Sequence, residues 1–179
     1  MTAPRRSLPP DGVIRADRLR LSVTDALWPL AIENAAAITD HFARRKAGNP
    51  SFYDGQVFVL RDVWLEGAGI AGTLSLERFS SFLYWRDGMA RDGATLDGFG
   101  SALVRSSEGH VLAVTAAQST LNAGQVFLPG GFIDQRDRRG DRSIDIDASI
   151  TRELLEETGL DAAALQRVPG YLVARSGRH

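Results

Sequence analysis

The sequence predicts a single α/β domain preceded by an N-terminal extension, and three observations lead to this expectation. The chain has 179 residues, which suffices for one domain and is too short for two of ordinary size. Apolar residues make up 44% of it and charged residues 24%, a globular composition. Segments with the alternation of strands are interspersed with segments of helical character. We expect residues 1–97 to form the extension, packing on a core formed by residues 98–179.

The N-terminal half is expected to contain a strand, a helix and a hairpin. Partial alternation of apolar and polar residues predicts a strand over 14–23. An Ala-rich segment that ends in basic residues before a Gly and a Pro predicts a helix over about 25–46. The turn dipeptide Asp54-Gly55 then precedes two apolar runs, 57–65 and 70–76, which predict paired strands.

An aromatic-rich segment over 79–85 follows the hairpin, and residues 86–98 have the glycine content of a loop. The aromatic segment predicts a short helix or a buried stretch of chain. Its large side chains fit either core packing or an interface with another protein, since aromatic residues are enriched in both places. These side chains are Phe79, Phe82, Tyr84 and Trp85.

In the C-terminal half, the turn Ser107-Glu108-Gly109 predicts a hairpin between strands over 99–105 and 111–117. A short apolar run follows at 126–128. Periodicity then predicts a helix over about 147–158, stopped by Gly159, and a last strand over 171–174.

Composition excludes several classes of function. The chain has no cysteine, which rules out disulfides, thiolate-held zinc and cysteine catalysis, and it has only three histidines. With a formal net charge of −1, no nucleic-acid partner is expected. No window approaches the roughly 18 apolar residues of a membrane-spanning helix, and no apolar run follows the first arginines. A cytoplasmic location without membrane association is therefore the expectation.

The chemistry is expected on the helix over 147–158. Glu153, Glu156 and Glu157 are spaced i, i+3 and i+4, which places three carboxylates on one helix face. Like charges so close repel, and a divalent cation with a preference for oxygen ligands reverses the sign of that interaction. Arg152 is placed to hold one of these carboxylates. The pattern Arg-Glu-x-x-Glu-Glu also occurs on ordinary solvated helices, so its context decides between the two readings.

The context is a pair of glycines after a short strand. Pro129-Gly130-Gly131 follows the run 126–128, and the lack of side chains at the glycines allows the backbone to approach a ligand closely. A strand, a glycine pair and a helix rich in carboxylates, followed by Gly159 and Leu160, together favour a metal and phosphate site.

These residues resemble the Nudix box, a Gly-x5-Glu-x7-Arg-Glu-apolar-x-Glu-Glu-x-Gly-apolar signature. The right half matches from Arg152 to Leu160, and the left half matches as Pro129-Gly130-Gly131, with Asp134 where a Glu is common. The resemblance implies an α/β/α sandwich with a mixed sheet and Mg²⁺-dependent hydrolysis of a nucleoside diphosphate linked to another group, with Mn²⁺ as the alternative metal. It also implies the roles of the site residues. Glu153, Glu156 and Glu157 would bind the metal, Arg152 and Glu153 would be catalytic, and Gly130 and Gly131 would bind substrate.

The left half of the box departs from the signature in its spacing. Gly131 and Arg152 are 21 positions apart where the signature has 14, so seven residues are inserted. Counting eight positions back from Arg152 gives Ile144 instead of a Glu. The carboxylates available to replace it are Asp137, Asp141, Asp145 and Asp147. The same Asp- and Arg-rich segment also has the character of a solvated loop.

The resemblance implies a C-terminally shortened fold, because only 19 residues follow Leu160 where the family continues through further strands and a second helix. Such an incomplete sheet could be completed in a homodimer. Residues 49–61 are similar to the N-terminal region of UDP-sugar diphosphatases of this superfamily, which would imply cleavage of a UDP-sugar into UMP and a sugar 1-phosphate. Two alternatives stay open: a non-catalytic Nudix-like module that binds a nucleotide or a protein, and an interaction domain without a nucleotide role.

Overall fold

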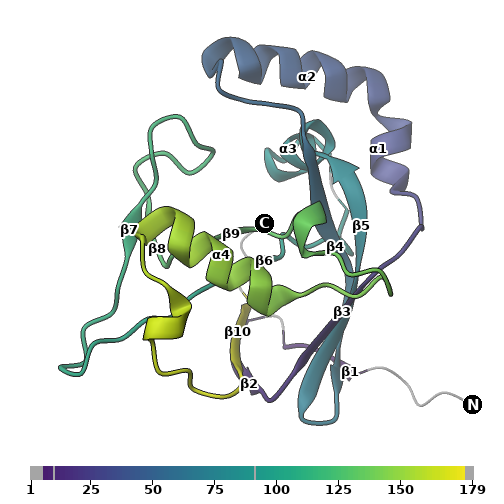
Figure 1. Cartoon of the computed structure of the whole chain (residues 1–179). Helices are drawn as coiled ribbons and strands as arrows, with labels where there is room; N and C mark the ends of the chain where they lie inside the picture. The colour runs from purple at the N-terminus through teal and green to yellow at the C-terminus, as the bar shows by residue number, and fades with distance from the viewer. Residues whose placement is uncertain (1–5, 10, 91, 176–179) are drawn as a thin grey trace, which may run out of the picture.

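The computed structural model describes residues 6–9, 11–90 and 92–175, and in this part of the chain the fold is mixed α/β (Figure 1). The α/β prediction is therefore confirmed at the level of the fold class. The strands are β1 (Arg6–Ser7), β2 (Gly12–Ala16), β3 (Leu19–Val23), β4 (Gln56–Glu66), β5 (Gly69–Arg78), β6 (Phe99–Ser101), β7 (Val114–Thr115), β8 (Val126–Phe127), β9 (Gly130–Phe132) and β10 (Tyr171–Arg175). The helices are α1 (Pro29–Glu33), α2 (Ala35–Gly48), α3 (Phe79–Arg86) and α4 (Ile146–Thr158), with single 3₁₀ turns η1 (Gln135–Asp137) and η2 (Ala162–Ala164).

The largest sheet is mixed and has four strands in the order β1-β4-β5-β3. The predicted hairpin forms its centre: β4 and β5 are antiparallel, and the turn between them contains Gly67 with a φ of 59°. A bulge at Arg61 separates the pairs Leu60–Leu74 and Asp62–Thr73. β3 pairs with β5 in parallel, which makes the sheet mixed.

The strand predicted over 14–23 is present but divided in two. β2 pairs antiparallel with β10, the last strand of the described chain, whereas β3 continues into the large sheet. Asp17 lies between them and donates its backbone N–H to the carbonyl of Ala68. The predicted last strand over 171–174 is thus confirmed, and its partner comes from the beginning of the chain.

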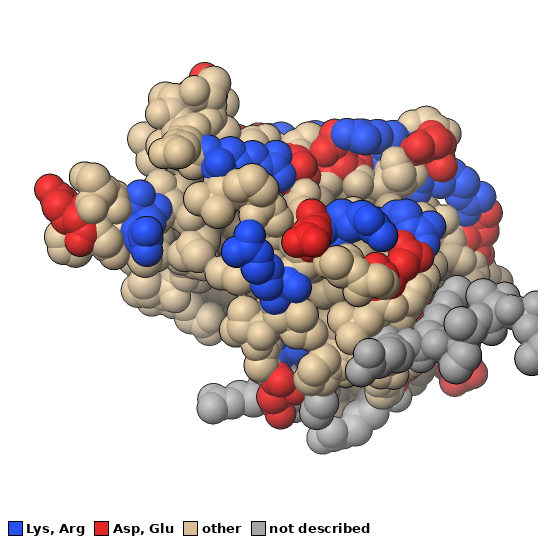
Figure 2. Space-filling model, turned by 90° about the horizontal axis from the view of Figure 1, so that it is seen from below, with Lys and Arg blue, Asp and Glu red and all other residues tan. Residues whose placement is uncertain are grey.

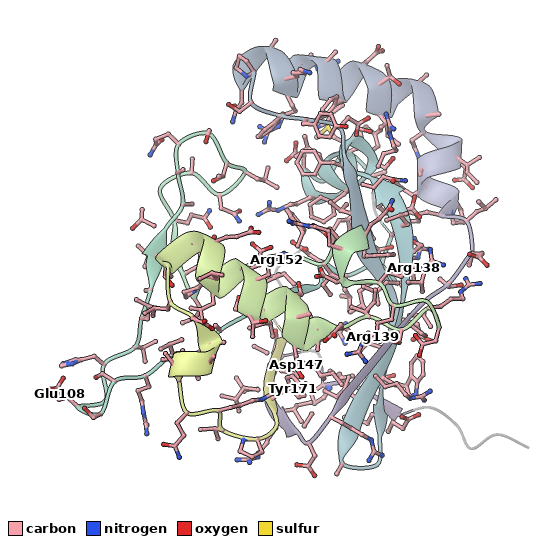
Figure 3. All side chains as sticks on the ribbon, viewed as in Figure 1. Glu108, Arg138, Arg139, Asp147, Arg152 and Tyr171 are labelled. Atoms are coloured by element: carbon pink, nitrogen blue, oxygen red, sulfur yellow. The ribbon has the colours of Figure 1, made fainter. Side chains whose placement is uncertain are left out.

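The hairpin predicted over 99–105 and 111–117 forms only next to its turn. β6 pairs with β9, and β7 pairs with β8, so both strands take partners from later in the chain. Around the turn, Arg105 and Val111 form a bridge. The backbone N–H of Ser106 donates to the carbonyl of His110, and that of Leu112 donates to the carbonyl of Val104. The arms form a projecting loop with Glu108 near its tip (Figure 3).

The helix predicted over 25–46 begins later and is broken. α1 starts at Pro29, in keeping with the preference of proline for the first turn, and Asn34 separates it from α2. The side-chain amide of Asn34 donates to the carbonyl of Leu30. α3 confirms both readings of the aromatic segment, because it is helical and because Phe82, Tyr84 and Trp85 are buried. These residues pack in the core rather than form an exposed interface.

The core crosses the predicted boundary at residue 97. One hydrophobic cluster joins three residues of the N-terminal segment with three of the C-terminal segment: Val23, Phe58, Leu74, Ile133, Ile144 and Ile146. A second cluster places α1, α2 and α3 over the opposite face of β4, around Val57 and Val59. The division into extension and core stays a prediction, and the packing of the first segment on the second is extensive.

The free edge of β3 is covered by the segment between η1 and α4. The backbone N–H of Val23 donates to the carbonyl of Arg142, and that of Ile144 donates to the carbonyl of Leu21. Arg142 has a φ of 70°, a conformation that residues with side chains rarely adopt. The Asp- and Arg-rich segment is thus held against the sheet by backbone hydrogen bonds.

The surface has charges of both signs. On the face seen in Figure 2, Lys and Arg alternate with Asp and Glu without gathering into a single-sign patch. In the part of the chain that the structure describes, no helix has the length and apolar character needed to span a bilayer.

Candidate functional site

α4 confirms the predicted helix and carries the acidic residues of the box. Its first turn is capped by Asp145, whose carboxylate accepts from the backbone N–H of Ala148 at 3.1 Å. It ends at Gly159, which has a φ of 73° and serves as a left-handed cap. Leu154 is buried and Ile150 packs against the cluster around Phe58, so the apolar side of α4 faces the sheet.

Glycines allow α4 to lie unusually close to β6 and β9. A Cβ added at Gly100 would lie 2.7 Å from Cγ1 of Ile150, and one at Gly131 would lie 2.7 Å from Cδ of Glu153. Contacts this short do not occur, so a side chain at Gly100 would clash with Ile150, and one at Gly131 would displace the Glu153 carboxylate. The carboxylate of Glu153 therefore rests directly on the backbone of β9.

Arg152 lies at the middle of the site and binds two carboxylates (Figure 3). Its Nη1 donates to Oε1 of Glu153 at 2.6 Å, and its Nη2 donates to Oδ1 of Asp137 at 2.7 Å. The predicted role of Arg152 in fixing a carboxylate is consistent with this geometry. The Asp137 side chain is only 2% exposed, so this ion pair is largely shielded from water.

Counting back from Arg152 did not find Asp137, the carboxylate that Arg152 contacts in the structure. It lies six positions after Gly131, the place that Gly-x5-Glu assigns to the signature's first acid, with Asp in place of Glu. Its Oδ2 accepts from the backbone N–H of Asp134 at 3.0 Å, which fixes the side chain at the start of η1. Counting forward from Gly131 would have found it.

The seven inserted residues consequently lie between Asp137 and Arg152. The backbone N–H of Asp145 donates to the carbonyl of Asp137 at 2.7 Å, so the inserted loop is closed where it leaves η1 and enters α4. Ile144, which stands at the signature position counted from Arg152, is buried in the core and has no polar role.

The three other candidate aspartates have structural partners. Asp141 accepts from the hydroxyl of Ser143 at 2.6 Å, and Asp145 caps α4 and pairs with Arg139. Asp147 accepts from the hydroxyl of Tyr171 and from Arg167, both at 2.9 Å, which ties the first turn of α4 to β10 (Figure 3). The contacts therefore single out Asp137 as the carboxylate that joins the box.

Glu156 and Glu157 lie at the exposed side of the same helix face. Oε1 of Glu156 is 3.5 Å from Nη1 of Arg136, and Oε2 of Glu157 accepts from the backbone N–H of Gly130 at 2.9 Å. Each of the three glutamates thus has a protein partner. Within residues 6–9, 11–90 and 92–175, no three Asp, Glu or His side chains converge as a preformed metal-binding group.

The charges of this face are coupled through Glu153. Burial raises the pKa of Glu153, Arg152 opposes the shift, and the neighbouring Glu156 and Glu157 add to it. Burial also disfavours the charged form of Arg152, yet the hydrogen bond to Asp137 and the negative charges of Asp137 and Asp134 together outweigh it and raise the pKa of Arg152. A carboxylate that is poorly solvated and faces other carboxylates gains most from a nearby cation.

The residues present fit a hard divalent cation. All candidate donors are carboxylate oxygens, the ligands that Mg²⁺ prefers. The Arg136 side chain that pairs with Glu156 is 59% exposed, so its ion pair is weak and easily exchanged.

Comparison of the chain with protein-family models, with curated proteins and with solved structures found no significant match. The site therefore rests on its residues and their geometry alone.

Proposed function

We propose that the protein is a Mg²⁺-dependent hydrolase of the Nudix type, which cleaves the phosphoanhydride of a nucleoside diphosphate linked to another group. One observation carries the proposal. The residues at the signature's first Gly, first acid, Arg and first Glu come from three different elements and form one continuous series of contacts. Gly131 contacts Glu153, Glu153 binds Arg152, and Arg152 binds Asp137. The α/β/α sandwich and the completion of the sheet in a homodimer belong to the same proposal.

The residues would divide the work as follows. Glu153, Glu156 and Glu157 would hold Mg²⁺, with Mn²⁺ as the substitute. When bound, the metal would neutralise the diphosphate and help to generate the attacking hydroxide. Arg152, anchored on the buried Asp137, keeps the Glu153 carboxylate in one orientation against Gly131. The backbone of Gly130 and Gly131 would line the side on which the substrate phosphates lie.

The test is a screen of nucleoside diphosphate derivatives with Mg²⁺, UDP-glucose among them, in which release of a nucleoside monophosphate is measured by chromatography. We expect Glu157→Gln to lower the turnover at least about 100-fold. Mutation of a residue that only hydrogen-bonds to a metal ligand already lowers activity by up to about that factor, and loss of a ligand itself should cost no less. Glu108→Gln is the matched control, since the Glu108 side chain is 77% exposed on the projecting loop. Equal turnover in the wild type and in Glu157→Gln would refute the assigned metal ligands.

A second candidate is a Nudix-like module that binds a nucleotide or a protein without hydrolysis. The observation in its favour is that Arg136, Arg152 and the N–H of Gly130 already occupy the three carboxylates. Calorimetric titration with UDP-sugars and Mg²⁺, run beside the product assay, separates the candidates. Binding without product supports the module, and product formation excludes it.

A further inference from the structure

An aromatic pocket lies beside β9 and is not used by the carboxylate site. Its volume is about 230 Å³, and it opens to solvent. Rings of Phe52, Tyr53, Phe79 and Phe132 form much of its wall, and the loop over 119–121 closes one side. We propose that this pocket binds the nucleobase of the substrate, an inference that rests on the proposed function and names the part of the substrate the pocket accepts.

The size and lining of the pocket favour a single planar ring system. Pockets for drug-sized ligands have volumes of roughly 300–1,000 Å³, so this smaller one accommodates a base better than a whole nucleotide. Aromatic walls bind every base through its π-face. Ser51, Ser119 and Thr120 are the polar residues of the lining, and the polar edge of a base needs hydrogen-bonding partners.

The pocket adjoins the carboxylate site by two routes. Phe132 directly follows Gly131, the residue on which the Glu153 carboxylate rests, so the two sites share β9. On the other route, Gly55 in the pocket wall precedes Gln56, whose side chain contacts Gln135 of η1. Gln135 precedes Arg136, the partner of Glu156. The two sites are thus linked through β9 and through η1, and a ligand with a base at one end and a diphosphate at the other would extend from one site to the other.

The pocket walls are held in place before any ligand arrives. The ring centroid of Phe132 lies 5.2 Å from that of Phe82 and 6.4 Å from that of Phe79, and Phe52 packs on Phe79 at 5.8 Å. Asn49 fixes the loop by donating from Nδ2 to the carbonyl of Ser119 at 3.1 Å. A preformed wall lowers the ordering cost of binding.

Tyr53 is the side chain best suited to test the inference. It is 80% exposed, and its ring lies against Gly55, where an added Cβ would be 3.3 Å from the ring. Removal of so exposed a ring takes little from the core. An exposed aromatic ring at the mouth of an aromatic pocket is placed to stack on a bound base.

The experiment measures binding of UMP, CMP, AMP and GMP to the metal-free protein by saturation-transfer NMR and by titration. At least one of these nucleotides should bind, and the saturation transferred from the protein should be stronger for its base protons than for its ribose protons. Tyr53→Ala should weaken that binding roughly tenfold, and Tyr53→Phe should retain it. Leu27→Ala, which removes another side chain that is 75% exposed, is the control.

The outcomes separate this inference from the proposed function. Hydrolysis of nucleoside diphosphate derivatives without any binding of the monophosphates, or binding that Tyr53→Ala does not weaken, overturns the base pocket and leaves the hydrolase standing. Tyr53-dependent binding by a protein that hydrolyses none of the derivatives supports the pocket and removes the hydrolase. Transfer confined to ribose protons also overturns the inference.

Discussion

At Gly131, the space in which other residues carry a Cβ is taken by the carboxylate of Glu153. The neighbouring glycines face different obstacles. A Cβ at Gly130 would meet the backbone of Gly100 and Ser101, which cannot move aside, whereas at Gly131 it would meet only the end of a flexible side chain. Substitution at Gly131 therefore disturbs the site more than the fold.

We accordingly predict that Gly131→Ala loses less than about 1 kcal/mol of stability, the ordinary range for substitutions without core damage. Turnover should fall about 100-fold, because a displacement of about 1 Å at a catalytic group has that effect. Gly140→Ala is the matched control, since a Cβ added at Gly140 would have no atom within 4 Å. Urea denaturation and the product assay measure the two effects, and unchanged turnover would contradict the role of the close approach.

Asp137 shows which residues of the candidate site could be predicted from the sequence and which could not. Arg152, Glu153, Glu156 and Glu157 follow from spacing within one helix, where geometry is fixed by the turn. The partner of Arg152 lies across an insertion of unpredictable length, so four aspartates remained possible. Only the fold shows that Asp137 turns inward while the other three bind elsewhere.

Among the elements, α4 carries three carboxylates on one face. When these groups are ionised they repel one another, and this repulsion destabilises the helix. Below about pH 4.5, the usual pKa of the group, Glu153 is protonated in the folded and the unfolded chain. As the pH rises towards the raised pKa of the folded state, the unfolded chain releases the proton more readily. The stability that the protonated carboxyl contributes is thus lost with rising pH.

We predict that Glu153→Gln is more stable than the wild type at neutral pH in the absence of divalent metal. The two proteins should converge as the pH falls below about 4.5. Addition of Mg²⁺ to about 100 times its dissociation constant should stabilise the wild type by about 2.7 kcal/mol and the variant far less. Thermal unfolding between pH 4 and 7, with chelator or Mg²⁺, measures both effects. A variant that is less stable at every pH would count against the argument.

The elements that the sequence predicts well are those with local signals. The β4–β5 hairpin, α3, α4 and β10 carry their alternation, aromatic run or caps within their own residues. The arms around Glu108 pair as predicted only beside the turn, because a turn signal specifies only the nearest partners. Farther from the turn, β6 pairs with β9 and β7 pairs with β8, and α4 packs on β6 and β9.

At the scale of the molecule, the cluster around Phe58 joins both segments of the chain. Ile133, Ile144 and Ile146 are buried against Val23, Phe58 and Leu74, which lie before the boundary at residue 97. β2 and β10 also pair across it. Neither segment covers its apolar side chains alone.

We therefore predict that a fragment of residues 98–179 does not fold, whereas the whole chain unfolds in one cooperative transition. Loss of a single large core side chain costs about 2–5 kcal/mol, and the fragment would lack the partners of several. Circular dichroism during heating and hydrogen exchange of the α4 amides provide the measurement. A sharp unfolding transition in the isolated fragment would show that the C-terminal segment is an independent domain.

The backbone bonds between Leu21 to Val23 and the residues Arg142 to Ile144 do more than position the box. The exposed edge of a β-strand has unpaired backbone N–H and C=O groups. Other polypeptide chains can pair with these groups, and such pairing leads to aggregation. The segment over 142–144 covers this edge and so hinders such addition. A variant that lacks this segment would leave β3 uncovered, and we expect it to self-associate even though its carboxylates are intact.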